Sequence, residues 1–201
     1  FLKFTENLVD NVTNYFGDTI DILINNNGGP PAKNVFDCSE EDWENAINRN
    51  FLSGVRLTKK IVPDMQKKNF GRVIFLTSVS GKEPDPGMVL SSTTRIATAA
   101  FSKTMSKEIT GSGITFNTIF TGGVLTDRAL GFLKADAKEN GISLNEMIEK
   151  VGKDLPVGYI AKPDEFAKTI LFLSSKESGY INGISLCVDG GFSHGVFWFK
   201  C

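Results

Sequence analysis

Residues 72–77 read Arg72-Val73-Ile74-Phe75-Leu76-Thr77, an almost unbroken run of branched and aromatic side chains that gives way to Ser78. A run of this kind is typical of a strand that is buried on both faces of a sheet. Three more runs have the same character, and polar residues or glycines follow each of them. They are residues 20–24, 114–120 and 184–188. The sequence therefore predicts four buried strands.

Amphipathic patterns that are typical of helices separate these runs. Ser39 is expected to cap a helix beginning at residue 40, because Asp42 stands three positions further on. Two further helices are expected over 55–67 and 93–109, and Pro163 is expected to open a fourth. Strands that alternate with helices predict an α/β fold, here a doubly wound, Rossmann-like parallel sheet.

Composition limits the classes of function that need to be considered. The chain has 201 residues, 41% of them hydrophobic, and 22 basic residues nearly balance 23 acidic ones. We expect one domain over residues 1–201, with no nucleic acid as partner because there is no excess of positive charge. No apolar run reaches the roughly 20 residues that span a bilayer, so no membrane is expected. Cys38, Cys187 and Cys201 lie far apart, which predicts neither a metal site nor a disulfide framework and favours the cytoplasm.

Residues 126–160 form the least regular part of the sequence. The stretch is long and mixed in charge, and glycines interrupt its short helical patterns. Segments of this kind often cover an active site. We therefore expect 126–160 to act as a lid over the substrate.

Five short motifs follow one another along the chain, four of them where an expected strand ends. They are Asn25-Asn26-Asn27-Gly28-Gly29, Asn50 within a helix, Thr77-Ser78-Val79-Ser80-Gly81, Thr121-Gly122-Gly123-Val124-Leu125-Thr126 and Val188-Asp189-Gly190-Gly191. In this order they resemble the short-chain dehydrogenase/reductase family, over about residues 8–192. The resemblance implies NADP or NAD as cofactor, with NADPH favoured, and a small-molecule substrate. Ligands of open parallel sheets bind beyond the carboxyl ends of the strands, where four of the motifs fall.

The sequence departs from the family at the start of the fold. In the family, a strand and a glycine-rich turn that cradles the dinucleotide pyrophosphate precede the first motif. Neither is found before Asn25. We therefore expect an N-terminally incomplete dinucleotide-binding and catalytic domain that lacks its first βαβ segment.

A second departure affects the catalytic centre. The family pattern has a Tyr thirteen residues after the catalytic Ser and a Lys four residues after that Tyr. Counted from Ser78, these positions hold Ser91 and Arg95, as in a divergent branch that the segment 90–95 resembles. A serine hydroxyl is a much weaker acid than a phenol of pKa near 10. Arg95 keeps a positive charge but does not titrate near neutral pH.

The resemblance assigns candidate roles to individual residues. Ser78 is expected to polarise the substrate oxygen, Asn50 to hold a water molecule, and Arg95 to anchor ribose or substrate, while Ser91 takes the tyrosine position. Lys82 is a further candidate for supplying charge or a proton. The candidate catalytic residues are Ser78, Asn50, Ser91 and Arg95, and the candidate cofactor-binding residues are Asn25, Gly28, Thr77, Arg95, Thr121, Gly122, Val124 and Thr126.

These observations predict an NAD(P)H-dependent oxidoreductase with an atypical active site that reduces a small carbonyl compound or a conjugated enone. A cofactor-free lyase or isomerase of the same fold is one alternative. A catalytically silent binding protein is another, because both Tyr and Lys are replaced. By resemblance we also expect a homo-oligomer, a dimer or a tetramer, in which the helices near 42–67 and 92–110 pack against their copies.

Overall fold

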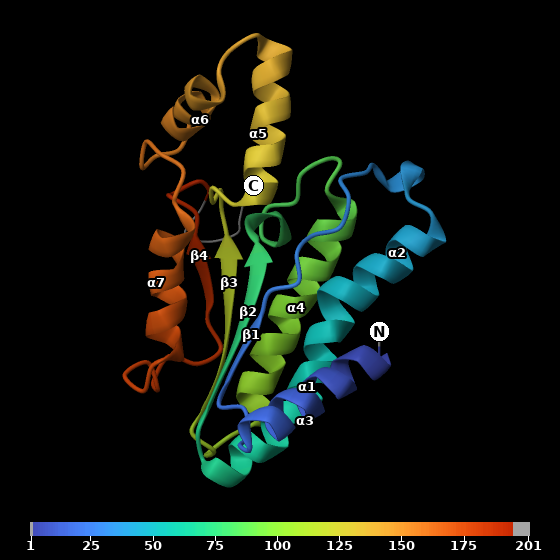
Figure 1. Cartoon of the computed structure of the whole chain (residues 1–201), viewed down its shortest axis with the longest axis vertical. Coiled ribbons are helices and arrows are strands. Elements are labelled where there is room, and N and C mark those ends of the chain that lie inside the picture. The colour runs from blue at the N-terminus through green and yellow to red at the C-terminus, as the bar shows by residue number, and fades with distance from the viewer. Residues whose placement is uncertain (1, 195–201) are drawn as a thin grey trace.

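A parallel sheet of four strands forms the centre of the computed structural model, which describes residues 2–194 (Figure 1). The strands lie side by side in chain order, so each crossover leads to the adjacent strand. The strands are β1 (Ile22–Asn25), β2 (Gly71–Ser78), β3 (Ile114–Thr121) and β4 (Ser185–Val188). All four predicted strands are confirmed, as is the doubly wound α/β class.

Seven helices and three shorter helical turns connect and cover the strands within the described residues. The helices are α1 (Leu2–Phe16), α2 (Glu40–Ile47), α3 (Ser53–Lys68), α4 (Val89–Glu108), α5 (Asp127–Asn140), α6 (Leu144–Lys153) and α7 (Pro163–Ser174), and the turns are η1 (Val35–Asp37), η2 (Asn48–Leu52) and η3 (Val79–Gly81). The capping box of Ser39 and Asp42 is present, and Pro163 opens α7 as predicted. The helix predicted over 93–109 begins earlier, at Val89.

One helix, α1, is not predicted by the sequence patterns. It packs along α3, and its Val9 joins the core on that side of the sheet. Tyr15 and Phe16, near its end, are exposed.

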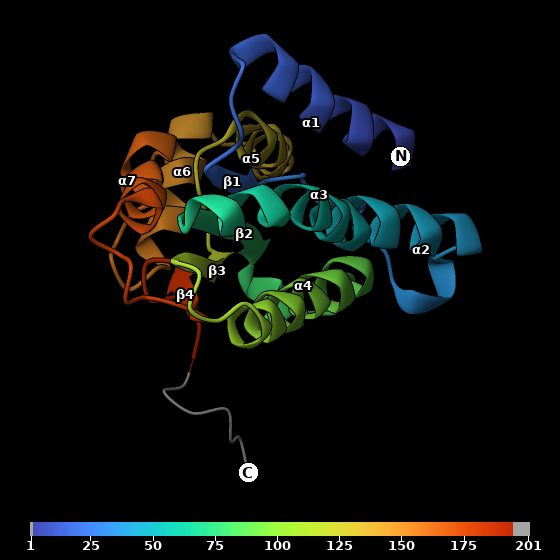
Figure 2. The same cartoon turned by 90° about the horizontal axis from the view of Figure 1, so that it is seen from below.

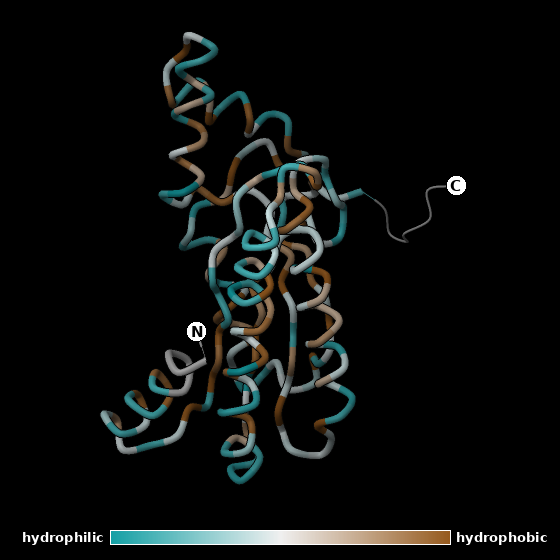
Figure 3. The backbone as a smooth tube through the Cα atoms, turned by 90° about the vertical axis from the view of Figure 1, so that its right-hand side faces the viewer, coloured by the Kyte–Doolittle hydropathy of each residue, from teal (hydrophilic) through white to brown (hydrophobic). Residues whose placement is uncertain are grey.

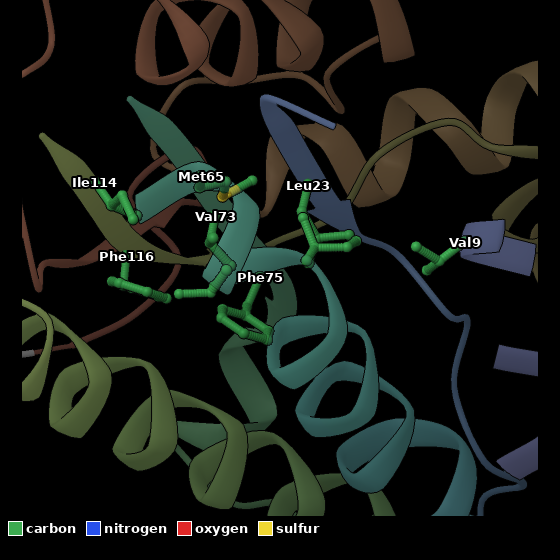
Figure 4. Close-up of a cluster of buried hydrophobic side chains, with 9 residues drawn as sticks. Val9, Leu23, Met65, Val73, Phe75, Ile114 and Phe116 are labelled. Atoms are coloured by element: carbon green, nitrogen blue, oxygen red, sulfur yellow. The ribbon is translucent and has the colours of Figure 1, made fainter. Parts of the chain in front are cut away.

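Helices cover the sheet on both faces, and side chains that alternate along each strand reach both layers. Val73 and Phe75 of β2 meet α3 and α4 in one cluster, to which Phe116 of β3 also belongs (Figure 4). Ile74 points the other way and packs with Phe166 of α7. Figure 2 shows α7 on one side of the sheet and α3 and α4 on the other.

The segment between β3 and α7 forms a helical hairpin of α5 and α6. It carries its own small cluster of buried side chains, centred on Leu133 and Met147. The hairpin stands beyond the carboxyl ends of the strands (Figure 1). Hydrophobic segments concentrate along the strands in Figure 3, whereas much of the chain at both ends of the molecule is hydrophilic. Within residues 2–194, no helix is long and apolar enough to cross a bilayer.

Candidate active site

A cavity of about 610 Å³ lies at the carboxyl ends of β1, β2 and β3. Its size falls within the range of small-molecule sites, and its place at the strand ends is where open α/β sheets bind ligands. The candidate residues that line it are Gly28, Thr77, Ser78, Ser91, Arg95, Thr121, Gly122, Val124 and Thr126. Asn25 and Asn50 do not line it.

The loop after β1 forms one wall of the cavity, and two side chains fix its backbone. Gly28 has a φ of 66°, in the left-handed region that favours glycine. Its carbonyl oxygen accepts hydrogen bonds from the Asn50 amide, at 2.8 Å, and from the Arg95 guanidinium. The loop is thereby tied to α4 and to the turn η2.

Asn50 lies in η2, a π-helical turn that joins α2 to α3. Its side chain donates to Gly28, and its backbone carbonyl accepts from the Thr98 hydroxyl at 3.1 Å. Turns of this type insert one extra residue into a helix and are frequent at functional sites. Buried Asn25 stands at the end of β1, and its amide nitrogen has no hydrogen-bond partner among the described residues. Both asparagines thus lie behind the loop that forms the cavity wall.

Two serine hydroxyls face the cavity at the end of β2 and the start of α4. The Ser78 oxygen accepts a hydrogen bond from the backbone N–H of Ser80 at 3.3 Å, which leaves its own proton free for donation. The Ser91 hydroxyl is 3.1 Å from that of Ser80, and Ser91 is only 5% exposed. Ser80 therefore links the two hydroxyl groups.

Arg95 contributes a buried positive charge to the same cavity. It is 8% exposed, and its guanidinium donates to the carbonyl oxygens of Gly28 and, at 3.1 Å, Leu76. Burial and, second, the nearby charge of Arg128 lower its pKa to about 10, so it remains charged at neutral pH. A Cβ atom at Gly81 would stand 2.8 Å from the Cβ of Arg95, so glycine is what lets η3 pack this close to α4.

The loop after β3 forms the opposite wall and offers mainly backbone to a ligand. A Cβ atom on Gly122 would lie 2.5 Å from the Cα atom of Asp189, so no other residue fits there without a shift of the backbone. Thr126 caps α5, its hydroxyl oxygen accepting from the backbone N–H of Ala129 at 3.3 Å. The Thr77 hydroxyl donates to the Ile119 carbonyl at 3.1 Å and holds β2 to β3.

The sequence patterns miss one charged residue of the cavity, Arg128. Its guanidinium donates to the carbonyl oxygens of Gly29, at 3.0 Å, and Pro30, at 3.3 Å. The one signal for Arg128 in the sequence is its position two residues after Thr126, the residue that caps α5. Phe132, one turn further along α5, also lines the cavity, and its ring lies under the Arg128 guanidinium at 5.6 Å.

The remaining sequence candidates for proton donation lie elsewhere. The Lys82 amine contacts the thiol of Cys187 at 3.5 Å and the hydroxyl of Ser193 at 3.4 Å, and it does not line the cavity. None of the tyrosines lines the cavity either, and Tyr15, Tyr159 and Tyr180 are all exposed. The acidic phenol of the family pattern is therefore absent from this cavity.

The cavity residues fit a nicotinamide dinucleotide in two respects. Gly28 and Gly122 line the cavity without side chains, which leaves room for a planar ring to approach the backbone. Each terminal nitrogen of Arg95 carries two N–H groups and donates to one carbonyl oxygen, which leaves donors for a ribose hydroxyl or a phosphate oxygen. Gly28, Thr121, Gly122 and Thr126 are the residues that would hold the cofactor.

Comparison of sequences finds relatives that are reductases. The profile of a family described as enoyl-(acyl carrier protein) reductase matches residues 3–193. The 3-oxoacyl-[acyl-carrier-protein] reductase FabG of Haemophilus influenzae is 33% identical over 186 residues, which are 92% of this chain and 72% of that protein. An uncharacterized oxidoreductase of Bacillus subtilis, YvaG, is 32% identical over 182 residues, 89% of this chain and 69% of that protein.

Solved structures with the same fold include further reductases. L-sorbose reductase from Gluconobacter frateurii, solved with NADPH and L-sorbose, matches with a TM-score of 0.89 and 28% identity, over 95% of this chain and 73% of that one. YwfH, described as an NADPH-dependent reductase involved in bacilysin biosynthesis, matches with a TM-score of 0.87 and 26% identity, over 96% of this chain and 74% of that one.

Proposed function

The chain belongs to the short-chain dehydrogenase/reductase family of NAD(P)-dependent oxidoreductases, and from that premise we propose that it reduces a small carbonyl compound or a conjugated enone with NADPH or NADH. NADPH is the favoured cofactor, since both reductases compared by structure are described with it.

One observation carries the proposal. A cavity at the strand ends is lined by Ser78, Ser91 and Arg95 and by the glycine-rich loops that follow β1 and β3. Hydroxyl and guanidinium donors are what a carbonyl oxygen needs as negative charge develops on it. The glycine-rich loops after β1 and β3 leave room beside the backbone for a planar nicotinamide ring.

The chemistry divides between the cofactor and the chain. When bound, the reduced nicotinamide supplies a hydride. Ser78 donates a hydrogen bond to the substrate oxygen, because its own oxygen already accepts from the Ser80 backbone. Arg95, charged at neutral pH, adds an electrostatic contribution at the same end of the cavity. Ser91 holds Ser80 in place and relays a proton through water.

The replacement of the phenol favours one kind of substrate. Serine and arginine stabilise an oxyanion by hydrogen bonds and charge, but neither is a good direct acid near neutral pH. In a conjugated enone the hydride adds to the β-carbon, the oxygen needs mainly stabilisation as an enolate, and the α-carbon then takes a proton from water. The site therefore suits an enone better than an isolated ketone.

Two further assignments follow from the family. Residues 126–160 cover the substrate, a role supported by Ala129 and Phe132 of α5, which line the cavity. The chain assembles into a homo-oligomer, a dimer or a tetramer, through its long helices. We infer a single domain over residues 1–201, with the segment 126–160 inside it.

The alternative is a cofactor-free lyase or isomerase, or a silent binding protein of this fold. The absence of any tyrosine from the cavity lining favours the silent binding protein, because the usual proton donor of the family is missing there.

Titration of the full chain with NADPH and NADH, followed by nucleotide fluorescence, tests the proposed function. We expect micromolar binding of one nucleotide and oxidation of that nucleotide when an enone is added. In Gly122→Val the side chain would collide with the backbone at Asp189 and shift the loop after β3, so nucleotide affinity should fall while circular dichroism checks that the variant folds. If the wild-type protein bound neither NADPH nor NADH, a cofactor-free enzyme or a silent binding protein would remain.

A further inference from the structure

Two guanidinium groups meet on one wall of the cavity, beside Gly29. Terminal nitrogens of both Arg95 and Arg128 lie 3.6 Å from the point where a Cβ atom on Gly29 would stand. Arg95 reaches this point from α4, and Arg128 reaches it from the first turn of α5. Two positive charges from distant parts of the chain are therefore brought close together.

Among the described residues, no acidic side chain pairs with either guanidinium group. The cavity lining holds no acidic side chain, and neither arginine forms a salt bridge within residues 2–194. Both guanidinium groups donate to backbone carbonyl oxygens instead, those of Arg128 to Gly29 and Pro30. Carbonyl oxygens satisfy hydrogen bonds but leave the charge of the pair at its full value.

Arg95 is the less favourably placed of the two arginines, because it is buried next to another positive charge. It is 8% exposed, and its Nε, which is fully buried, has no hydrogen-bond partner among the described residues. Loss of hydration and the repulsion from Arg128 both lower its pKa, to about 10. An anion placed between the two groups would offset the repulsion and satisfy donors that are now unused.

We propose that Arg95 and Arg128 form a binding site for the carboxylate of an anionic substrate, whose reducible oxygen lies at Ser78 and Ser91. The inference rests on the proposed function and narrows its substrate class. Ser91 and Arg95 are four residues apart on α4, so their Cβ atoms are neighbours on one helix face, roughly 5–6 Å apart. A carboxylate at the arginine pair is then only a few bonds from an oxygen at the serines. The substrate class is a short oxo acid, saturated or with a conjugated double bond.

A phosphate group of the cofactor is also an anion that two arginines would bind. The test therefore distinguishes a substrate carboxylate from a cofactor phosphate. The probe for the carboxylate site is malonate, titrated by calorimetry into the full chain without nucleotide. The variants are Arg128→Gln and, as matched control, Lys134→Gln, which removes one charge from the exposed side of the same helix. Because Arg128 is exposed, its replacement leaves the core intact, and circular dichroism checks the fold.

The wild-type protein and Lys134→Gln are expected to bind malonate alike, whereas Arg128→Gln loses about tenfold or more in affinity, the effect of removing a charged hydrogen-bond donor. Its NADPH dissociation constant is expected to stay within about twofold of the wild-type value. Malonate binding that is absent from the wild-type protein, or unchanged in Arg128→Gln, would overturn the inference. So would a tenfold rise in the NADPH dissociation constant of this variant, because the pair would then serve the cofactor.

The two proposals fail in different ways. If the wild-type protein binds neither nucleotide, the proposed function is lost, and the malonate titration still decides whether the arginine pair is a carboxylate site.

Discussion

At the scale of single residues, the site has several serine hydroxyls and an arginine where the family pattern has one tyrosine phenol. Ser78, Ser80 and Ser91 form a short row of hydroxyl groups, and the charge of Arg95 stands beside them. The Ser80 and Ser91 hydroxyls contact each other, whereas Ser78 is joined to Ser80 through the backbone N–H and keeps its own proton for a hydrogen bond to the substrate oxygen. Stabilisation of the substrate oxygen by preorganised donors is the main contribution available to such a site.

Replacement of Ser78 by alanine tests this view. Ser78→Ala removes the donor that faces the substrate oxygen, and we expect kcat/KM to fall by about 10²–10³, the usual effect of losing one oxyanion donor. The dissociation constant of NADPH should not change, because the hydroxyl does not belong to the cofactor walls. Steady-state kinetics with an enone and fluorescence titration measure the two quantities.

Ser185→Ala is the matched control, because Ser185 is an exposed serine at the start of β4 and away from the cavity. Its activity should equal that of the wild-type protein. If Ser78→Ala were as active as the wild-type protein, Ser78 would have no role in catalysis.

At the scale of elements, irregularities in the helices place the site residues. The π-helical turn η2 separates α2 from α3 and directs the amide of Asn50 to the Gly28 carbonyl. The neighbouring Asn27 donates to the Ser53 hydroxyl at 2.7 Å, which ties the same loop to the start of α3. The loop after β1 is thus held by helices that begin well outside the cavity. The orientation of α2 therefore affects the wall of the site.

The cap of α2 predicts a dependence of stability on pH. The Asp42 carboxylate accepts from the Lys33 amine at 2.7 Å and from the Ser39 backbone at 2.9 Å, and these bonds lower its pKa from 3.8 to about 2. A carboxylate with a lowered folded-state pKa stabilises the fold above pH 3.8, and this stabilisation is lost as the pH falls through 2. Asp42→Asn should therefore have a lower Tm than the wild-type protein at pH 7, and the difference should shrink between pH 5 and pH 2.

Thermal unfolding followed by circular dichroism at several pH values measures this difference. Glu41→Gln removes one charge from the same helical turn without touching the capping box, and it should lower the Tm less at pH 7. If the Tm difference between Asp42→Asn and the wild-type protein were constant from pH 7 to pH 3, the lowered pKa of Asp42 would not contribute to stability.

At the scale of the whole molecule, both faces of the sheet are covered, yet apolar side chains remain outside the clusters. Ile96 of α4 is 50% exposed and Ile47 of α2 is 40% exposed, and these are the helices that the family resemblance assigns to contacts between subunits. Exposed apolar surface on long helices is what an interface between copies of the chain would bury.

A charged residue on this surface should weaken assembly. We expect the wild-type chain to elute as a dimer or tetramer, and Ile96→Asp to shift towards a smaller mass because a buried carboxylate at the interface is costly. Size-exclusion chromatography with light scattering measures the mass. Thr104→Asp, at an exposed polar position of the same helix, is the control and should keep the wild-type mass. A wild-type monomer would contradict the expected assembly.

The sequence by itself determined the fold class, the four strands and the order of the motifs along them. The reason is local, because runs such as 72–77 are too apolar to lie anywhere but in a sheet that is covered on both faces, and parallel strands bring their carboxyl ends to one edge. Helix caps such as Ser39 and Pro163 depend on neighbouring residues only and were predicted for the same reason.

Only the tertiary structure decided which side chains share the cavity. Asn25 and Asn50 fit the family motif in sequence yet do not line the cavity, and the Asn50 amide binds the Gly28 carbonyl instead. Arg128 has no motif of its own and reaches the cavity because the first turn of α5 lies against the loop after β1. Contacts between residues this far apart in the chain depend on how whole elements pack, which no local pattern records.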